Sequence, residues 1–257
     1  MIFESHAHYD DEKFDNERDL LIQNLLSGKI CSIINVGATI ESTKMSIALA
    51  EKYEHVYAAA GVHPSEVSEL NEETFEWLKS QTKHEKVVAV GEIGLDYYWD
   101  KEPNVQKMQK EWFMRQMNLA RESSLPVIIH SRDAAEDTMK IMKQIHAEEI
   151  PGVVHCYSYS PEMAAEFVKM GYYIGVGGVV TFKNAKKLKE TVAKIPLTKI
   201  LLETDAPYMA PEPYRGKRND SGKLIFVAEK IAQIKGISVE EVEAVTKENA
   251  ENLFQIV

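Results

Sequence analysis

The stretch PVIIHSRDAAEDTMKIMKQIHAEEIPGVVHCYS, residues 126–158, contains one complete copy of a unit that repeats along the chain. Its two short apolar runs, 126–130 and 152–156, have the length of buried strands, and a histidine lies at or near the end of each. Between them lies an amphipathic stretch that is long enough for a helix. A strand, a helix and a second strand in this order are typical of a parallel βαβ unit.

The same alternation continues in both directions, and helix start signals stand between the strands at Asn71, Ser160-Pro161 and Ser238. Eight repeats in 257 residues, with no break in composition, predict a single domain, residues 1–257, folded as a (β/α)₈ TIM barrel. An open, doubly wound sheet is the alternative, but no GxGxxG turn follows the first strand. The expected strands are 2–6, 30–36, 56–61, 87–92, 126–130, 152–156, 172–177 and 200–204.

Composition restricts the classes of partner. The net charge of −10 argues against a broad basic surface for duplex nucleic acid, and no apolar stretch is long enough to span a membrane. The sequence shows no secretory signal, and Cys31 and Cys156 are expected to be reduced, so a cytoplasmic protein is predicted. The basic stretch 183–189 is expected to be a solvated helix face, whereas a functional role for 214–218 stays open.

Side chains of metal-ligand type stand at the ends of five of the expected strands. In a TIM barrel, the carboxyl ends of the strands converge on one mouth, where enzymes of this fold keep their active sites. Taken singly, each residue could be a buried polar group or a helix cap; together they form a ligand set for one or two divalent metals. These residues are His6, His8, Glu92, His130, His155 and Asp205.

Six motifs taken together resemble the TatD family of metal-dependent deoxyribonucleases, which lies within the amidohydrolase-like metal barrels. They are SHAH (5–8), GVHP (61–64), GEIGLDYY (91–98), IIHSR (128–132), VVHCYS (153–158) and ETDAPY (203–208). The resemblance runs in order from residue 3 to NAENLF (249–254).

The resemblance implies a ligand assignment. His6, His8 and Asp205 would bind one metal, and Glu92 would bridge to a second metal held by His130 and His155. Related amidohydrolases often carry a carboxylated lysine where this chain has Glu92. That difference favours the TatD family over hydantoinase- or urease-type enzymes.

The resemblance also implies a 3′-to-5′ exonuclease acting on the ends of single-stranded or frayed DNA. Two divalent ions (Mg, Mn, Zn or Ni) would activate a water for in-line attack on phosphorus, with Asp205 as ligand and proton acceptor and Glu92 as the shared catalytic carboxylate. The same ligands would serve a metal-dependent deacylase or amidohydrolase that cleaves an ester or amide. A non-catalytic, metal-binding interaction module is a further alternative. The sequence leaves the oligomeric state open and is compatible with a monomer.

Further residues are expected to contact the substrate. His63 in GVHP and Arg132 two residues past His130 are candidates, although each could be an ordinary loop or helix-start residue. Asp96 could position basic side chains or cap a helix. Tyr97 and Tyr98 could stack on a base, although core packing is favoured for at least one of them.

Two buried carboxylates are expected beneath the metals. By strand parity, Glu4 and Glu203 should both face the barrel interior and lie close together. Glu4 stands where the family usually has Asp. Like charges in contact should force one carboxylate to take up a proton or recruit a partner. We predict that both orient the ligand imidazoles.

Overall fold

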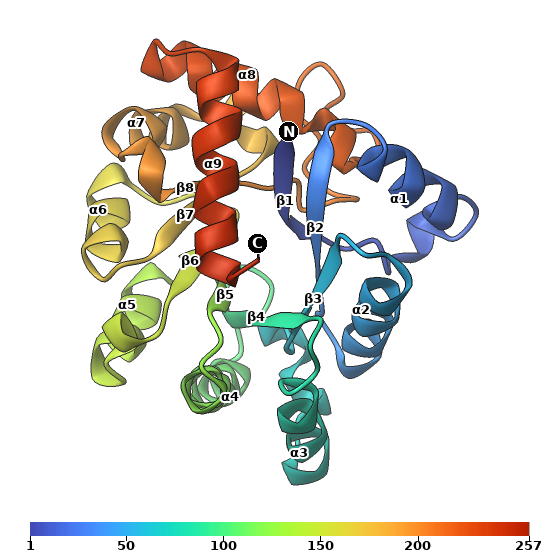
Figure 1. Cartoon of the computed structure of the whole chain (residues 1–257). Coiled ribbons are helices and arrows are strands. Elements are labelled where there is room, and N and C mark those ends of the chain that lie inside the picture. The colour runs from blue at the N-terminus through green and yellow to red at the C-terminus, as the bar shows by residue number, and fades with distance from the viewer. Residues whose placement is uncertain (257) are drawn as a thin grey trace.

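The structure is a computed structural model of the chain and describes residues 1–256. Eight parallel strands follow one another around a ring in sequence order (Figure 1). The first and last strands meet through a parallel bridge between Ala7 and Ala206, and the Asp205 N–H donates to the His6 carbonyl at 2.9 Å. The strands are β1 (Ile2–Ala7), β2 (Ile30–Val36), β3 (Val56–Ala60), β4 (Val87–Asp96), β5 (Val127–Arg132), β6 (Gly152–Val154), β7 (Tyr173–Val176) and β8 (Ile200–Leu202).

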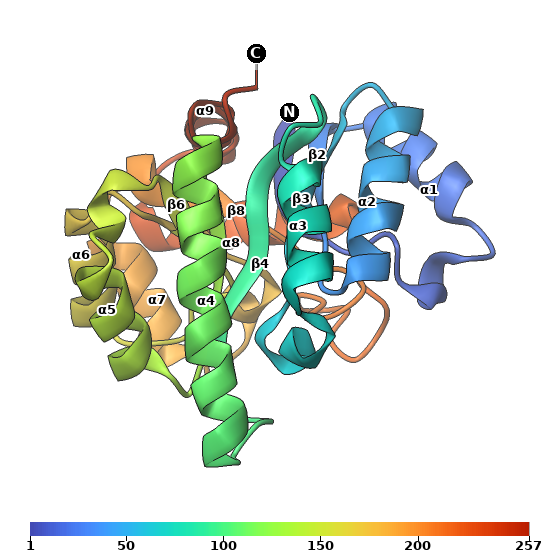
Figure 2. The same cartoon turned by 90° about the horizontal axis from the view of Figure 1, so that it is seen from below.

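Helices surround this ring on the outside (Figures 1 and 2). The predicted start signals are present: Asn71 forms a capping box, and the side chains of Ser160 and Ser238 accept backbone N–H groups at 3.3 and 3.1 Å. The α-helices are α1 (Arg18–Leu26), α2 (Ile40–Lys52), α3 (Glu72–Gln81), α4 (Pro103–Ser123), α5 (Ala135–Gln144), α6 (Pro161–Lys169), α7 (Lys186–Lys194), α8 (Leu224–Lys235) and α9 (Val239–Phe254). The TIM barrel prediction is confirmed, and the open sheet is wrong. None of the helices within residues 1–256 combines the length and apolar character needed to cross a bilayer.

The last helix, α9, closes one end of the barrel. Leu253 and Phe254 pack in one buried cluster with residues from the barrel strands, and the Phe254 ring stacks on Phe3 at 6.1 Å. Phe3 lies near the start of β1, so α9 covers the amino-terminal ends of the strands. The opposite end, where the strands finish, remains for the site.

The observed strands differ from the predicted ones mainly at their carboxyl ends. β4 extends four residues further than expected, to Asp96, while β6 and β8 stop before His155 and Asp205. A close approach between β4 and β5 depends on Gly94, whose φ is +145°. A Cβ atom there would lie 1.9 Å from the His130 carbonyl oxygen. Gly94 therefore allows the two strands that carry Glu92 and His130 to pack closely.

Candidate metal centre

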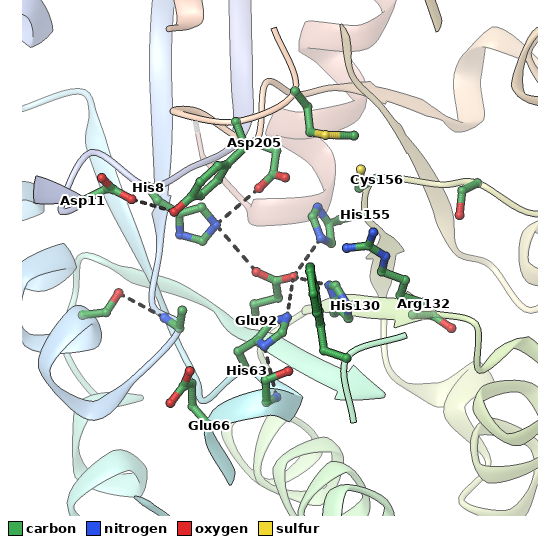
Figure 3. A pocket seen from close by; sticks show the side chains of 18 of the residues that line it. His8, Asp11, His63, Glu66, Glu92, His130, Arg132, His155, Cys156 and Asp205 are labelled. Carbon is green, nitrogen blue, oxygen red and sulfur yellow. Dashed lines mark hydrogen bonds and ion pairs between the residues drawn. The ribbon is translucent and has the colours of Figure 1, made fainter. Parts of the chain in front are cut away.

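The six residues with metal-ligand side chains gather at the carboxyl end of the barrel. Five of them line a cavity of about 740 Å³, and His6 lies fully buried beneath them. Glu92 stands between two groups, with His8 and Asp205 on one side and His130 and His155 on the other (Figure 3). The convergence that the strand ends predicted is therefore present.

The first group has the geometry of a tetrahedral ion site. His6 Nε2 lies 3.1 Å from His8 Nε2, 3.4 Å from Glu92 Oε2 and 3.8 Å from Asp205 Oδ1. His8 Nε2 lies 3.7 and 3.5 Å from the same two oxygens. Ligands about 2.0–2.2 Å from one tetrahedral ion are separated by about 3.3–3.6 Å. The four side chains therefore surround a point that a divalent cation fits.

The second group uses the other oxygen of Glu92. Oε1 lies 2.7 Å from His130 Nδ1 and 2.8 Å from His155 Nε2. These separations have hydrogen-bond length and are shorter than the spacing of two ligands on one ion. A cation in this group would have to move the donors apart, so we expect it to bind less tightly than one in the first group.

The hydrogen bonds of the imidazoles leave the metal-facing nitrogen free. His8 Nδ1 lies 2.8 Å from the Val36 carbonyl, and His130 Nε2 lies 3.0 Å from Asp96 Oδ2. Because an acceptor holds the ring proton on one nitrogen, the lone pair is on the other, which points at the cluster. A neutral His8 would thus bind through Nε2 and a neutral His130 through Nδ1.

Two buried ring atoms complete this pattern. Nδ1 of His6 and of His155 and Oε2 of Glu203 are buried and make no hydrogen bond within residues 1–256. An imidazole that ligates through Nε2 carries its proton on Nδ1. The two rings thus direct a potential Nδ1 donor away from the cluster, and the three residues come close enough for their polar atoms to interact.

The pKa values reflect the crowded charges. Burial opposes charge on His8 and His155, but nearby carboxylates outweigh it and raise the pKa of His8 to about 9 and that of His155 to about 10. Burial and the proximity of His155 lower the pKa of His6 to about 4. Despite burial, the imidazoles hold the pKa values of Glu92 and Asp205 below their usual range. The site thus has anionic ligands at its centre, as cation binding requires.

His63 and Arg132 both line the cavity, as predicted for substrate contacts. Burial and the neighbouring His130 lower the pKa of His63 to about 3, and its Nδ1 accepts the Ser65 N–H at 3.1 Å. Its ring proton is therefore on Nε2, which favours a hydrogen-bond donor over a metal ligand. The Arg132 guanidinium forms no hydrogen bond or ion pair within the described chain and is the only Arg or Lys lining the cavity.

The predicted contact of Asp96 with substrate is wrong. This residue is 1% exposed, because both its carboxylate oxygens are engaged inside the protein. Oδ2 faces His130, and Oδ1 accepts the N–H groups of Tyr98 and Trp99 at 2.9 and 3.0 Å. Asp96 therefore orients a ligand imidazole and the adjoining loop. Tyr97 packs against the core, as favoured for one of the two tyrosines, and Tyr98 lies under Arg132.

The expected contact between Glu4 and Glu203 is also absent from residues 1–256. Glu4 accepts the N–H groups of His6 and Thr204 at 3.1 and 2.9 Å, so it holds backbone and no imidazole. Burial raises its pKa to about 8. The pairing of β1 with β2 shifts register beside Glu4, so simple strand parity does not describe this region.

Glu203 fits its prediction better. Its Oε1 lies 3.7 Å from His155 Nδ1, and the carboxylate also accepts the Cys156 N–H. Space for it depends on Gly175, because a Cβ there would lie 2.3 Å from Glu203 Oε2. Burial raises the pKa of Glu203 to about 7. Its place beside a ligand ring is that of a residue that orients it.

Other cavity residues were missed by the sequence analysis. Trp99, Tyr208 and Met209 line the mouth and are 67%, 47% and 40% exposed. A run of three aromatic residues before a charged loop, YYWDKE (97–102), was a signal that could have identified the first of them. The basic stretch 214–218 does not line the cavity, and its Arg218 binds Glu17. The stretch 183–189 enters α7 on the outside of the barrel.

Comparisons with known proteins agree with this geometry. The family model described as TatD related DNase matches residues 3–255. The chain is 44% identical over 256 residues to the uncharacterized metal-dependent hydrolase YabD of Bacillus subtilis, covering 100% of both chains. It is 35% identical over 259 residues to the uncharacterized metal-dependent hydrolase YcfH of Escherichia coli K12, covering 100% of this chain and 96% of YcfH.

A solved structure supports the same assignment. The TatD homologue YjjV of Escherichia coli K12 superposes with a TM-score of 0.93 at 32% identity, covering 100% of this chain and 98% of that one. The fold, the family model and the relatives therefore agree: the chain belongs to the TatD family and is a metal-dependent hydrolase.

Proposed function

We propose that this hydrolase is a deoxyribonuclease that removes nucleotides from the 3′ ends of single-stranded or frayed DNA. The observation that carries the proposal is the position of Glu92, which presents one oxygen to each of two donor groups. Two cations held in this way are suited to a phosphodiester, because they can offset charge on both the attacking and the leaving oxygen. The match to the family described as TatD related DNase supports this choice of substrate.

The chain's own residues would supply positioning and proton transfer. Divalent cations bound by the two groups would provide Lewis acidity and an activated water. Asp205 is the most suitable proton acceptor, because its side chain is 20% exposed to the cavity whereas that of Glu92 is only 5% exposed. The Arg132 guanidinium and His63 Nε2–H would donate to the phosphate oxygens. Water oxygen would bond to phosphorus as the P–O3′ bond breaks, and the departing oxygen would take up a proton.

The charge of the cavity is compatible with a DNA end. Arg132 is the one cationic side chain of lysine or arginine type in the lining, which matches a single phosphate better than a long duplex backbone. We expect the protein to act as a monomer on DNA ends. The free thiols Cys31 and Cys156 are compatible with the expected cytoplasmic location.

One observation favours the deacylase alternative. Asp10, Asp11, Glu66 and Asp100 also line the cavity, and such a lining would accept the ammonium group of an aminoacyl ester. The interaction-module alternative has no comparable support, because the family is one of hydrolases.

A nuclease assay distinguishes these proposals. Single strands labelled at the 3′ or the 5′ end, with metal removed and restored, should lose the 3′ label first and only with metal. Release from an aminoacyl ester without release from 3′-hydroxyl DNA would favour the deacylase. Asp205→Asn should abolish turnover, and full activity in this variant with metal still bound would refute the assignment of Asp205 as base. The exposed Asp19→Asn is a matched control.

A further inference from the structure

Large exposed apolar side chains concentrate at the mouth of the cavity. Trp99 on the loop after β4 is 67% exposed, the highest value among the large apolar side chains in the described chain. Tyr208 and Met209, on the loop after β8, line the same cavity. Scattered apolar residues are ordinary on protein surfaces, but a cluster of them around a cavity indicates a binding function.

The backbone of Trp99 is fixed relative to the metal centre. Its N–H donates to Asp96 Oδ1 at 3.0 Å, and Asp96 Oδ2 lies 3.0 Å from His130 Nε2. One buried carboxylate therefore sets both the ligand imidazole and the position of the tryptophan. Its indole N–H makes no hydrogen bond within residues 1–256, so the side chain remains free to meet a ligand.

Trp99 is better placed than its neighbour to receive a planar ligand. The Arg132 guanidinium covers the ring of Tyr98 at 3.9 Å, while it lies 5.6 Å from the centre of the Trp99 ring. Tyr98 and Trp99 pack edge to face at 4.8 Å, and of the two only Trp99 lines the cavity. Tyr98 therefore supports Arg132, and Trp99 presents an aromatic surface beside it.

We propose that Trp99 stacks on the base of the nucleotide whose phosphate is bound by Arg132. This inference rests on the proposed function and names a substrate-binding residue within it. A cation for the phosphate and an uncharged aromatic surface for the base stand next to each other, as a nucleotide requires. Stacking on an aromatic ring needs no particular base, so the residue should add affinity without selecting sequence.

The acidic residues of the lining do not compete for this role. Asp100 Oδ2 accepts hydrogen bonds from Ser65 and Gln109, each at 2.8 Å. Asp11 Oδ2 accepts one from the Tyr208 hydroxyl at 2.8 Å. These carboxylates hold the loops around the mouth, which leaves Arg132 and Trp99 as the free groups for a phosphate and a base.

Binding of a short thymidine oligonucleotide with phosphorothioate linkages tests the proposal without turnover. Trp99→Ala should raise the dissociation constant between about 5-fold and about 150-fold, the effect of removing one stacked base. Trp99→Phe keeps an aromatic surface and should recover most of the affinity. Binding should also quench tryptophan fluorescence in the wild type, and this quenching should be lost in Trp99→Phe although the ligand still binds.

A second oligonucleotide that lacks its last two bases provides the control. Trp99→Ala and the wild type should bind it with equal affinity, because there is no base to stack. With cleavable DNA, Trp99→Ala should raise KM and leave kcat nearly unchanged. The stacking proposal is overturned if Trp99→Ala binds the complete oligonucleotide as tightly as the wild type. It is also overturned if the variant weakens binding of both oligonucleotides equally, because Trp99 would then act through the loop.

The outcome for the proposed function is read separately. The nuclease proposal fails if the wild type cleaves no DNA with any metal. The stacking proposal is decided by the binding constants of the two oligonucleotides, whatever the result of the cleavage assay.

Discussion

Filling the metal centre should release about two protons per protein molecule at pH 7. The pKa of His8 is raised to about 9 and that of His155 to about 10, so both rings carry a proton at pH 7 before metal is added. Each must become neutral when it binds a metal ion. The pKa of His6 is lowered to about 4, so this ring has no proton to lose. His130, whose pKa is raised as well, adds a fraction to the count.

The same count determines how metal affinity depends on pH. Because about two protons leave, the overall dissociation constant for filling both groups should fall about 100-fold for each unit of pH between about 6 and 8. The raised pKa values lie above this window, so protons compete with metal throughout it. The dependence should weaken only as pH passes about 9, where His8 begins to lose its proton unaided.

Isothermal titration calorimetry measures the protons directly. Metal-free protein, titrated with Mn²⁺ in two buffers of different ionisation enthalpy, gives the number released from the difference in heat. His8→Asn should remove one proton from the count, and His146→Asn, whose side chain is 72% exposed and outside the centre, should leave it unchanged. Heat that is independent of the buffer in the wild type, or an unchanged count in His8→Asn, would refute the reasoning.

Three further changes test the supporting geometry. Gly94→Ala should lower the free energy of unfolding by more than about 2 kcal/mol in a denaturant titration, because its Cβ would meet the His130 carbonyl; a stability equal to the wild type would contradict the close approach. Glu203→Gln should weaken metal affinity about 10- to 100-fold in competition with a chelator, and no effect would remove Glu203 from the support of His155. His130→Asn alters only the second group, so metal analysis after desalting should find about one ion per protein where the wild type has about two; equal loss of both ions would argue against separate groups.

The fold could be predicted because alternation between strand and helix is a property of local sequence. The bounds of β2 match the prediction, and the helix starts at Asn71, Ser160 and Ser238 carry their expected caps. The ligand set could also be predicted, because the topology of a barrel brings strand ends together whatever the details of packing.

Side-chain partners could not be predicted in the same way. Glu4 turns to backbone N–H groups beside a register shift between β1 and β2, and strand parity contains no information about such a shift. Asp96 is buried because β4 continues past Glu92, which the apolar run alone did not indicate. Trp99 stands in a loop, where no periodicity reports which side chains point at the cavity.

The position of α9 has a practical consequence for handling the protein. The helix ends with Phe254 against the amino-terminal end of the barrel, and the Met1 ammonium binds Glu243 on the same helix at 2.9 Å. Both ends of the described chain therefore lie on the side opposite the mouth. A surface, bead or fluorescent reporter attached behind α9 through a linker would face away from incoming substrate, so the protein could be immobilised in a defined orientation with its cavity open to solution.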